Sequence, residues 1–296
     1  MCCAGVPYTA VETALTVLTA LWITAVSYTH LRGRDMRFGI STSCFYPEET
    51  DRALARLLDA DVSLVEVFFN TFSELEDGYI AHMGSLLAAH GAAVSQMHPF
   101  TSAMEGFFFA TDYGPRTEDG LRLYEKYFSV CRALGIPRLV LHGQLAASPY
   151  PFEGYCRNYL RLREAGRQYG VEVLQENVVN YQCGTPDKVR RLRELTGGDA
   201  GFVLDTKQLR RAGVPLEQML EAMGDKVRHV HISDSTPQRD CVTPGDGTED
   251  FSALAAHLAA IGYGGDMIVE LYRDGFSGIE DLLRGLAFIK REFAGI

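Results

Sequence analysis

The chain has 296 residues, of which 47% are hydrophobic, and this allows one large globular α/β domain or two small ones. Its formal net charge of −10 disfavours nucleic acid as a partner, because a polyphosphate backbone repels an acidic protein. The seven cysteines form no C-x-x-C pair, which is typical of reduced thiols in a cytoplasmic protein. We therefore expect a cytoplasmic globular protein that does not bind nucleic acid.

Residues 1–35 do not share the pattern of the rest of the chain. The apolar run Ala14–Val26 is short for a membrane span, which needs about 20 residues, and no Lys or Arg precedes it as in a signal peptide. The segment Val26–Leu31, VSYTHL, resembles the translation of a transposon-end adapter used in sequencing libraries. We predict that residues 1–35 are a non-native or disordered extension and that residues 36–296 form the domain. A genuine flexible or membrane-associating segment is the alternative.

From Met36 onward, strand-like runs alternate with helix-like runs. The strand-like runs are Arg37–Ser41, Leu64–Phe69, Ala93–His98, Arg138–His142, Glu172–Glu176, Gly201–Asp205, Val227–His231 and Met267–Glu270. Eight alternations match a single (β/α)8 TIM barrel, which takes roughly 250 residues. A doubly wound open sheet is the alternative, but the even count favours closure. The predicted fold class is therefore α/β, a (β/α)8 barrel in one domain.

The helix-like runs between the strands carry recognisable start and stop signals. They are Pro47–Ala60, Arg116–Leu134, Thr185–Leu195, Pro215–Met223, Phe251–Ile261 and Ile279–Phe293. Thr185 is a capping residue followed by proline in the first turn, and the run from Arg116 stops at Gly135. These signals support the alternation of strands and helices.

The last four strand-like runs each end on a residue that can bind a metal or transfer a proton. These residues are Glu176, Asp205, His231 and Glu270, and they succeed one another at roughly the spacing of a strand–helix–strand unit. The carboxyl ends of the strands of such a barrel form one face, where active sites lie. Because side chains alternate along a strand, His229 and His231 share a face within Val227–Ser235, VRHVHISDS. We therefore predict that the four strand-end residues converge in one site.

Three carboxylates and one imidazole form a hard, oxygen-rich donor set. Such a set suits Mn²⁺, Co²⁺ or Mg²⁺, with Zn²⁺ as an alternative. Three anions in one cavity also need a divalent cation to offset their repulsion. For any one of them alone, an ordinary solvated or hydrogen-bonded strand end is the less favoured alternative. We predict one divalent metal ion bound by Glu176, Asp205, His231 and Glu270.

The motifs around these residues resemble those of the xylose-isomerase-like sugar phosphate isomerase/epimerase family (AP endonuclease family 2). The motifs are QEN at Glu176, LDTKQ at Asp205, HVHISDS at His231 and IVELY at Glu270, with the loop Pro244–Gly247 and the pair Asp250-Phe251. The resemblance covers essentially residues 36–296. It implies that the four strand-end residues bind one divalent metal. It also implies that Glu176 and Glu270 are the acid–base pair on opposite faces of a ketose.

The proposed chemistry also follows from the residue types. Isomerising or epimerising a ketose removes a proton next to a carbonyl and passes through an enediolate. A metal polarises that carbonyl, one carboxylate takes the proton, and a second returns it. We therefore predict an enzyme, a metal-dependent sugar or sugar phosphate isomerase/epimerase. Its expected partner is a small carbohydrate, not nucleic acid or a membrane, and a homo-oligomer is left open.

Other residues at strand ends are candidates for binding the substrate. His98 and His142 end the third and fourth runs, and pocket-lining hydrogen bonds are favoured slightly over extra metal ligands. Gln208 stands where many relatives carry His in a D-x-x-H pattern, which leaves the particular sugar open. Arg239 follows the seventh strand, where barrels often bind phosphate, although a lone arginine is more often a surface residue.

Two charged residues near these strands are harder to assign. Glu66 lies within an apolar strand, where it either supports the metal site or pairs with a buried base. We also include Glu66 among the candidate substrate contacts. Lys207 follows Asp205 closely, and a solvated charge at a helix start is the favoured interpretation.

Three other functions compete with the isomerase/epimerase. A lyase of the same superfamily, such as an inosose or dehydroshikimate dehydratase or a C-glycoside-cleaving enzyme, would use the same carboxylates and metal. A DNA-repair nuclease of the endonuclease IV type is disfavoured by the acidic charge and by Gln208 and Cys241 near the positions of that family's extra histidines. A non-catalytic sugar-binding module is disfavoured by the complete set of four candidate ligands.

Overall fold

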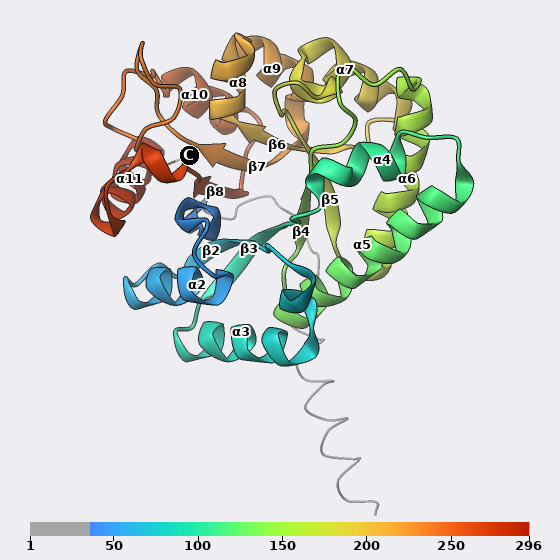
Figure 1. The fold of residues 1–296 in the computed structure, drawn as a ribbon. Helices are drawn as coiled ribbons and strands as arrows, with labels where there is room; N and C mark the ends of the chain where they lie inside the picture. The colour runs from blue at the N-terminus through green and yellow to red at the C-terminus, as the bar shows by residue number, and fades with distance from the viewer. Residues whose placement is uncertain (1–35, 296) are drawn as a thin grey trace, which may run out of the picture. The chain divides into compact units, whose positions relative to one another are not determined.

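A computed structural model describes residues 36–295, and they form a closed barrel of eight parallel strands in sequence order (Figure 1). The strands are β1 (Arg37–Ser41), β2 (Leu64–Phe68), β3 (Ala93–His98), β4 (Arg138–Leu141), β5 (Glu172–Glu176), β6 (Gly201–Asp205), β7 (Val227–Ile232) and β8 (Asp266–Val269). Each strand pairs with the next, and β1 pairs with β8. The predicted (β/α)8 barrel is confirmed, and the open sheet is excluded.

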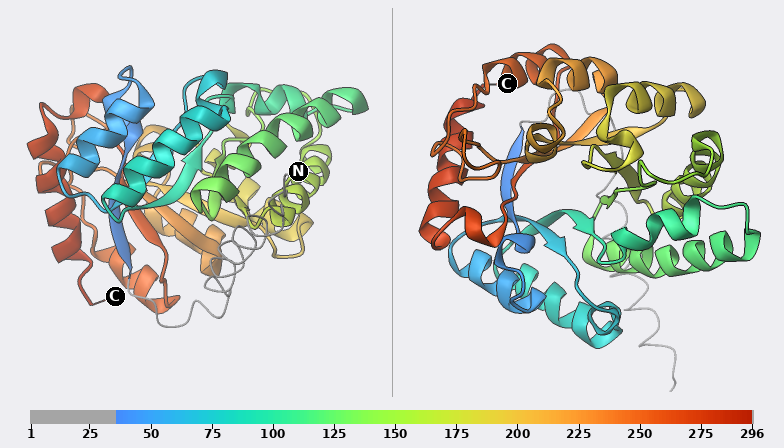
Figure 2. Two further views of the ribbon diagram at one scale, coloured as in Figure 1. Left: turned by 90° about the horizontal axis from the view of Figure 1, so that it is seen from below. Right: turned by 45° about the horizontal axis from the view of Figure 1, so that its top comes forward.

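Helices connect the strands and surround the barrel, as the right-hand view of Figure 2 shows. The α-helices are α2 (Thr50–Asp59), α3 (Asp77–Ala89), α4 (Glu105–Phe109), α5 (Gly114–Leu134), α6 (Phe152–Gln168), α7 (Pro186–Leu195), α8 (Thr206–Ala212), α9 (Leu216–Met223), α10 (Ser252–Ala260) and α11 (Ile279–Glu292). Short 3₁₀ turns are η1 (Thr42–Phe45), η2 (Phe72–Leu75), η3 (Ser102–Met104), η4 (Gln182–Gly184), η5 (Gly224–Lys226) and η6 (Arg273–Gly275).

The observed helices match the predicted runs closely, and their buried faces explain why. In α2 the residues Ala53, Leu54, Leu57 and Leu58 are buried, as their helical spacing predicts. Helix α5 begins at Gly114, earlier than the predicted Arg116, and places proline in its first turn. Helices α3, α4, α6 and α8 were not bounded from the sequence. Among them α8 starts directly after β6, which has consequences for the site.

The interior of the barrel below the strand ends is filled by side chains. Val140, Leu174 and Val203 form a small apolar cluster separate from the main core. Asp266, at the start of β8, forms ion pairs of 2.8 Å with Arg37 Nε and 2.9 Å with Arg138 Nη1. Inward-pointing layers of this kind are typical of TIM barrels.

Strand register aligns the carboxyl ends at one edge of the barrel. Asp205 on β6 is paired with His231 on β7, and His231 is paired with Ile268 on β8, just before Glu270. Glu66 on β2 is paired with Gln96 on β3. The polar residues that end separate strands are therefore neighbours in space.

The prediction that residues 1–35 are a non-native or disordered extension lies outside the described residues. Within residues 36–295, no helix has both the length and the apolar character needed to cross a membrane.

Candidate active site

The four predicted metal ligands come together at the carboxyl ends of β5 to β8. One ligand atom from each of Glu176, Asp205, His231 and Glu270 lies within 4.8 Å of the others, and all four residues are buried. His231 Nδ1 is 3.1 Å from Glu176 Oε1, 3.4 Å from Glu270 Oε2 and 3.9 Å from Asp205 Oδ2. The imidazole therefore faces three carboxylates. We refer to these four residues as the quartet.

The two carboxylate oxygens of Asp205 have different surroundings. Asp205 is the N-cap of α8, and its Oδ1 accepts a hydrogen bond of 3.1 Å from the backbone N–H of Gln208. Asn177 fixes the Asp205 backbone through two hydrogen bonds of 2.7 and 3.0 Å. Oδ2 is buried and accepts no hydrogen bond within the described part of the chain. The cap thus orients Asp205, and Oδ2 faces the ammonium of Lys207 at 3.4 Å without a hydrogen bond.

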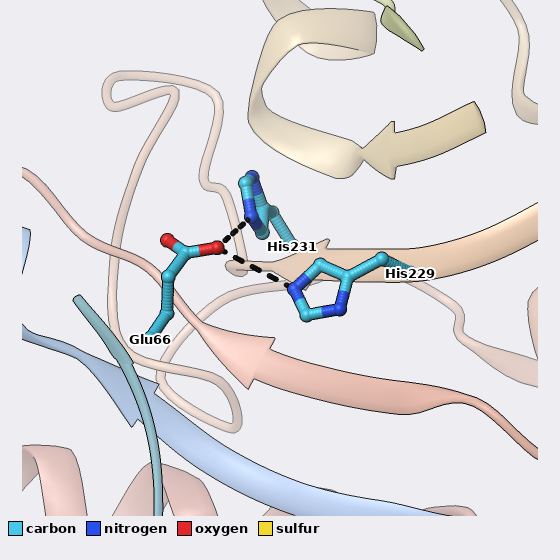
Figure 3. Close-up of side chains that lie close together, drawn as sticks. All are labelled: Glu66, His229 and His231. Carbon is cyan, nitrogen blue, oxygen red and sulfur yellow. Dashed lines mark hydrogen bonds and ion pairs between the residues drawn. The ribbon is translucent and has the colours of Figure 1, made fainter. Parts of the chain in front are cut away.

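Glu66 and His229 support His231 from below, as Figure 3 shows. Glu66 Oε2 lies 2.8 Å from His231 Nε2 and 3.5 Å from His229 Nε2. Ser41 and Gln96 also donate hydrogen bonds to the Glu66 carboxylate, of 3.0 and 2.9 Å. With a cation bound, a neutral His231 would donate its Nε2–H to Glu66 and turn the lone pair of Nδ1 toward the quartet. This is the carboxylate–histidine arrangement that orients metal-binding histidines.

The quartet carries an excess of negative charge in a buried place. Burial raises the pKa of Asp205 to about 7, and the carboxylates of Glu176 and Glu270 contribute to this rise. Burial alone would raise the pKa of Glu176, but His142 and His231 hold it well below its usual range. Burial would lower the pKa of His231, but Glu66 and Glu270 raise it. A bound cation would relieve the repulsion among these carboxylates.

A cavity of about 460 Å³ opens above the quartet, a size that suits a small-molecule ligand. It is lined by Ser43, Tyr46, Phe68, Asn70, His98, Phe100, Ser102, His142, Glu176, Lys207, Gln208, Glu270, Leu271 and Tyr272. Three predicted substrate contacts, His98, His142 and Gln208, are among these residues. The aromatic residues were not predicted, because Tyr46, Phe100 and Tyr272 lie in loops or turns and Phe68 ends β2 without a polar group that would single it out.

Two predicted substrate contacts lie elsewhere. Glu66 is fully buried beneath His231 and does not line the cavity, and its contact with His231 fits both alternatives, because His231 is at once a buried base and a proposed metal ligand. Arg239 does not line the cavity either, and its guanidinium donates to the backbone carbonyl of Asp274. Glu66 and Arg239 are therefore not among the proposed substrate contacts.

His98 and His142 form a pair at the edge of the cavity. Their Nε2 atoms are 3.0 Å apart, and His142 Nε2 is 3.2 Å from Glu176 Oε2. Burial, together with the neighbouring His142, lowers the pKa of His98 to about 4. Burial would also lower the pKa of His142, but contact with Glu176 raises it. Ligand atoms of His98, His142 and Glu176 lie within 4.8 Å of one another, so the sequence alternative of extra metal ligands stays open.

Lys207 is not the solvated charge that the sequence suggested, and that interpretation is wrong. It is only 4% exposed, and its Nζ lies 2.9 Å from Glu270 Oε2 and 3.4 Å from Asp205 Oδ2. Helix α8 begins at Thr206, so its first turn stays at the strand end and directs Lys207 inward. The sequence signal was the close spacing to Asp205.

The predicted motif loop Pro244–Gly247 lies beside the end of β7. Asp234 is buried, and its carboxylate accepts hydrogen bonds from the backbone N–H groups of Ser235, Gly245, Gly247 and Glu249. The loop is therefore folded around Asp234. Sequence reasoning did not single out Asp234, although it lies within HVHISDS.

Glu105, at the start of α4, is a buried carboxyl group near His142. It accepts hydrogen bonds from Tyr124 Oη, at 2.7 Å, and from the backbone N–H of Gly143, and burial raises its pKa to about 7. Since the folded protein then binds this proton more tightly than the unfolded chain, the free energy of unfolding should fall as pH rises from about 4.5 to about 7.

We expect Glu105→Gln to reduce the pH-dependent fall in the free energy of unfolding by up to about 3 kcal/mol, because glutamine stays neutral at every pH. Urea unfolding of both proteins at pH 4.5 and pH 8 measures it. If glutamine fails to accept one of the hydrogen bonds that Glu105 accepts, the free energy of unfolding falls equally at both pH values. The difference between the two pH values therefore reports only the titration of Glu105. Parallel pH profiles of the two proteins would contradict the prediction.

Fold and site together define a (β/α)8 barrel with a carboxylate–histidine cluster at the ends of its last four strands. A family model described as "Xylose isomerase-like TIM barrel" matches residues 54–292. The chain belongs to this family, as the sequence motifs indicated.

Individual relatives are distant. The chain is 26% identical over 179 residues to inosose isomerase of Bacillus velezensis. This alignment covers 54% of this chain and 64% of that protein. It spans about half the length of the inosose isomerases that it matches. A crystal structure of D-psicose 3-epimerase in the presence of D-fructose has a TM-score of 0.74 at 16% identity and covers 88% of this chain and all of that one. The IOLI protein with a bound zinc atom has a TM-score of 0.69 at 16% identity, with 88% and 100% covered.

Proposed function

We propose that the protein is a sugar isomerase or epimerase that uses one divalent metal ion. The observation that carries this proposal is the position of Glu176 and Glu270. Both carboxylates line the cavity, and both belong to the quartet with Asp205 and His231. The names of the relatives, inosose isomerase and D-psicose 3-epimerase, support the same class of reaction.

The quartet fits a divalent cation. Its donors are three carboxylates and one imidazole, Asp205 Oδ2 is buried without a hydrogen bond in the described structure, and Glu66 orients His231. When bound there, a divalent cation would polarise the substrate carbonyl and stabilise the negative charge that develops on its oxygen. The donor set suits Mn²⁺, Co²⁺ or Mg²⁺, and the zinc-bound IOLI structure supports Zn²⁺ as an alternative.

Glu176 and Glu270 are suited to taking and returning a proton next to the carbonyl. His142 and His231 lower the pKa of Glu176, so its carboxylate is ionised, the form that a general base must have before it takes a proton. Ser43 Oγ donates a hydrogen bond of 3.4 Å to Glu270 Oε1, and Lys207 contacts Glu270 Oε2. Burial alone would raise the pKa of Glu270, but Lys207 and His231 lower it. The two carboxylates thus form a pair of general bases at one cavity.

The rest of the cavity suits a small polyhydroxylated ligand. His98, His142 and Gln208 offer hydrogen bonds to hydroxyl groups, and Phe68, Phe100 and Tyr272 offer apolar surface to the C–H faces of a ring. We therefore propose a small ketose or keto-cyclitol as the substrate.

A substrate panel tests this function. The purified protein is incubated with ketoses, their phosphates and inososes in the presence of Mn²⁺, Co²⁺ or Mg²⁺, and products are followed by NMR. The proposal expects an isomer or epimer whose formation stops when the metal is chelated. An elimination product would instead identify a lyase. Binding of a sugar without any conversion would identify a sugar-binding module.

Duplex DNA with abasic sites is not expected to be a substrate. The net charge of −10 opposes binding to a polyphosphate backbone. A labelled abasic duplex should remain intact on a denaturing gel with each metal. Incision by the wild-type protein that disappears in Glu176→Ala would replace the isomerase with a nuclease.

A further inference from the structure

Lys207 is a buried cation in contact with two of the four quartet residues. Its Nζ is 2.9 Å from Glu270 Oε2 and 3.4 Å from Asp205 Oδ2, and it lies 4.7 Å from the centre of the Tyr272 ring. The ammonium is therefore held on several sides, by two carboxylates and an aromatic ring.

We propose that Lys207 competes with the divalent metal for Asp205 and Glu270 and so weakens metal binding. This inference rests on the proposed metal centre. The two oxygens that Lys207 contacts, Asp205 Oδ2 and Glu270 Oε2, are those nearest His231 Nδ1 from each residue, at 3.9 and 3.4 Å. A cation bound among the four residues must take these oxygens from the ammonium or share them with it.

The charges of the site lead to the same conclusion. The quartet carries three carboxylates, and Lys207 offsets one of them, so a divalent cation meets a smaller net attraction than it would without the lysine. A neutral side chain of similar length would remove both the competition and the repulsion between the two cations. Lys207 thus lowers the affinity of the quartet for the metal.

Metal-binding measurements on the full chain test this proposal. Mn²⁺ is titrated by calorimetry into metal-free wild-type protein, Lys207→Met and the exposed control Lys126→Met, at one pH. We expect Lys207→Met to bind Mn²⁺ at least about tenfold more tightly than wild type, the scale on which residues next to metal ligands change affinity. Lys126→Met should match wild type.

Two further variants separate charge from shape. Lys207→Arg keeps the charge and should retain the weak affinity of the wild type, whereas Lys207→Gln should bind tightly and replaces the Met variant if that protein does not fold. Equal or weaker Mn²⁺ binding by the neutral variants would overturn the role of Lys207. If Asp205→Ala and wild type bind Mn²⁺ identically, the metal centre itself is wrong, and the inference fails with it.

Discussion

Asp205→Asn is expected to lower the affinity for Mn²⁺ at least about 10–100-fold, and Asp205→Ala to lower it further. Asparagine keeps the oxygen that caps α8 but removes the charge of Oδ2. Alanine also removes the cap, which costs about 1 kcal/mol of stability. Metal content after dialysis and calorimetric titration measure the affinity, and thermal unfolding measures the loss of the cap.

The matched control for this prediction is Asp240→Asn, which changes a half-exposed aspartate paired with Arg211 outside the quartet. It should bind Mn²⁺ as the wild type does. If Asp205→Asn and Asp240→Asn retain the same metal affinity, the quartet is not a metal site.

The second large effect concerns catalysis by the two glutamates. At saturating Mn²⁺, Glu176→Gln and Glu270→Gln should each lower kcat by about 10²–10⁴-fold, the usual contribution of general acid–base catalysis. Glutamine keeps an oxygen ligand and nearly the same shape, but it cannot accept and return a proton. Turnover of the substrate found in the panel, measured with metal occupancy determined in parallel, checks this expectation.

Glu172→Gln is the control, because Glu172 lies at the opposite end of the same strand as Glu176 and pairs with Arg228. It should keep full turnover. The two catalytic variants should also separate the half-reactions, since each removes one of two bases. Near-full turnover by both metal-saturated variants would contradict the acid–base assignment and leave only the metal role.

Much of the barrel could be predicted from local patterns. Short apolar runs bounded by helix signals identified all eight strands, and the alternation of residues placed His229 and His231 on one inward face. Because parallel strands end at one face of a barrel, the residues that end β5 to β8 could also be brought together without coordinates.

The errors arose where burial depends on three-dimensional neighbours. The sequence indicates a helix start at Lys207, but it does not show that the first turn of α8 directs this side chain inward, where two carboxylates stabilise its charge. Glu66 was ambiguous because its partner His231 is far along the chain and meets it only across the barrel. Arg239 is exposed, as a lone arginine after a strand more often is, and its guanidinium donates to the backbone carbonyl of Asp274.

Exchange of hydrogen with solvent tests whether Glu176 and Glu270, together with the metal, remove the proton next to the substrate carbonyl. Wild-type protein, its substrate and Mn²⁺ are combined in deuterated water, and deuterium at the carbon next to the carbonyl is followed by NMR. We predict metal-dependent incorporation at that carbon, strongly reduced in Glu176→Gln or Glu270→Gln. Conversion of the substrate without incorporation, or incorporation that neither chelation of the metal nor either substitution slows, would contradict it.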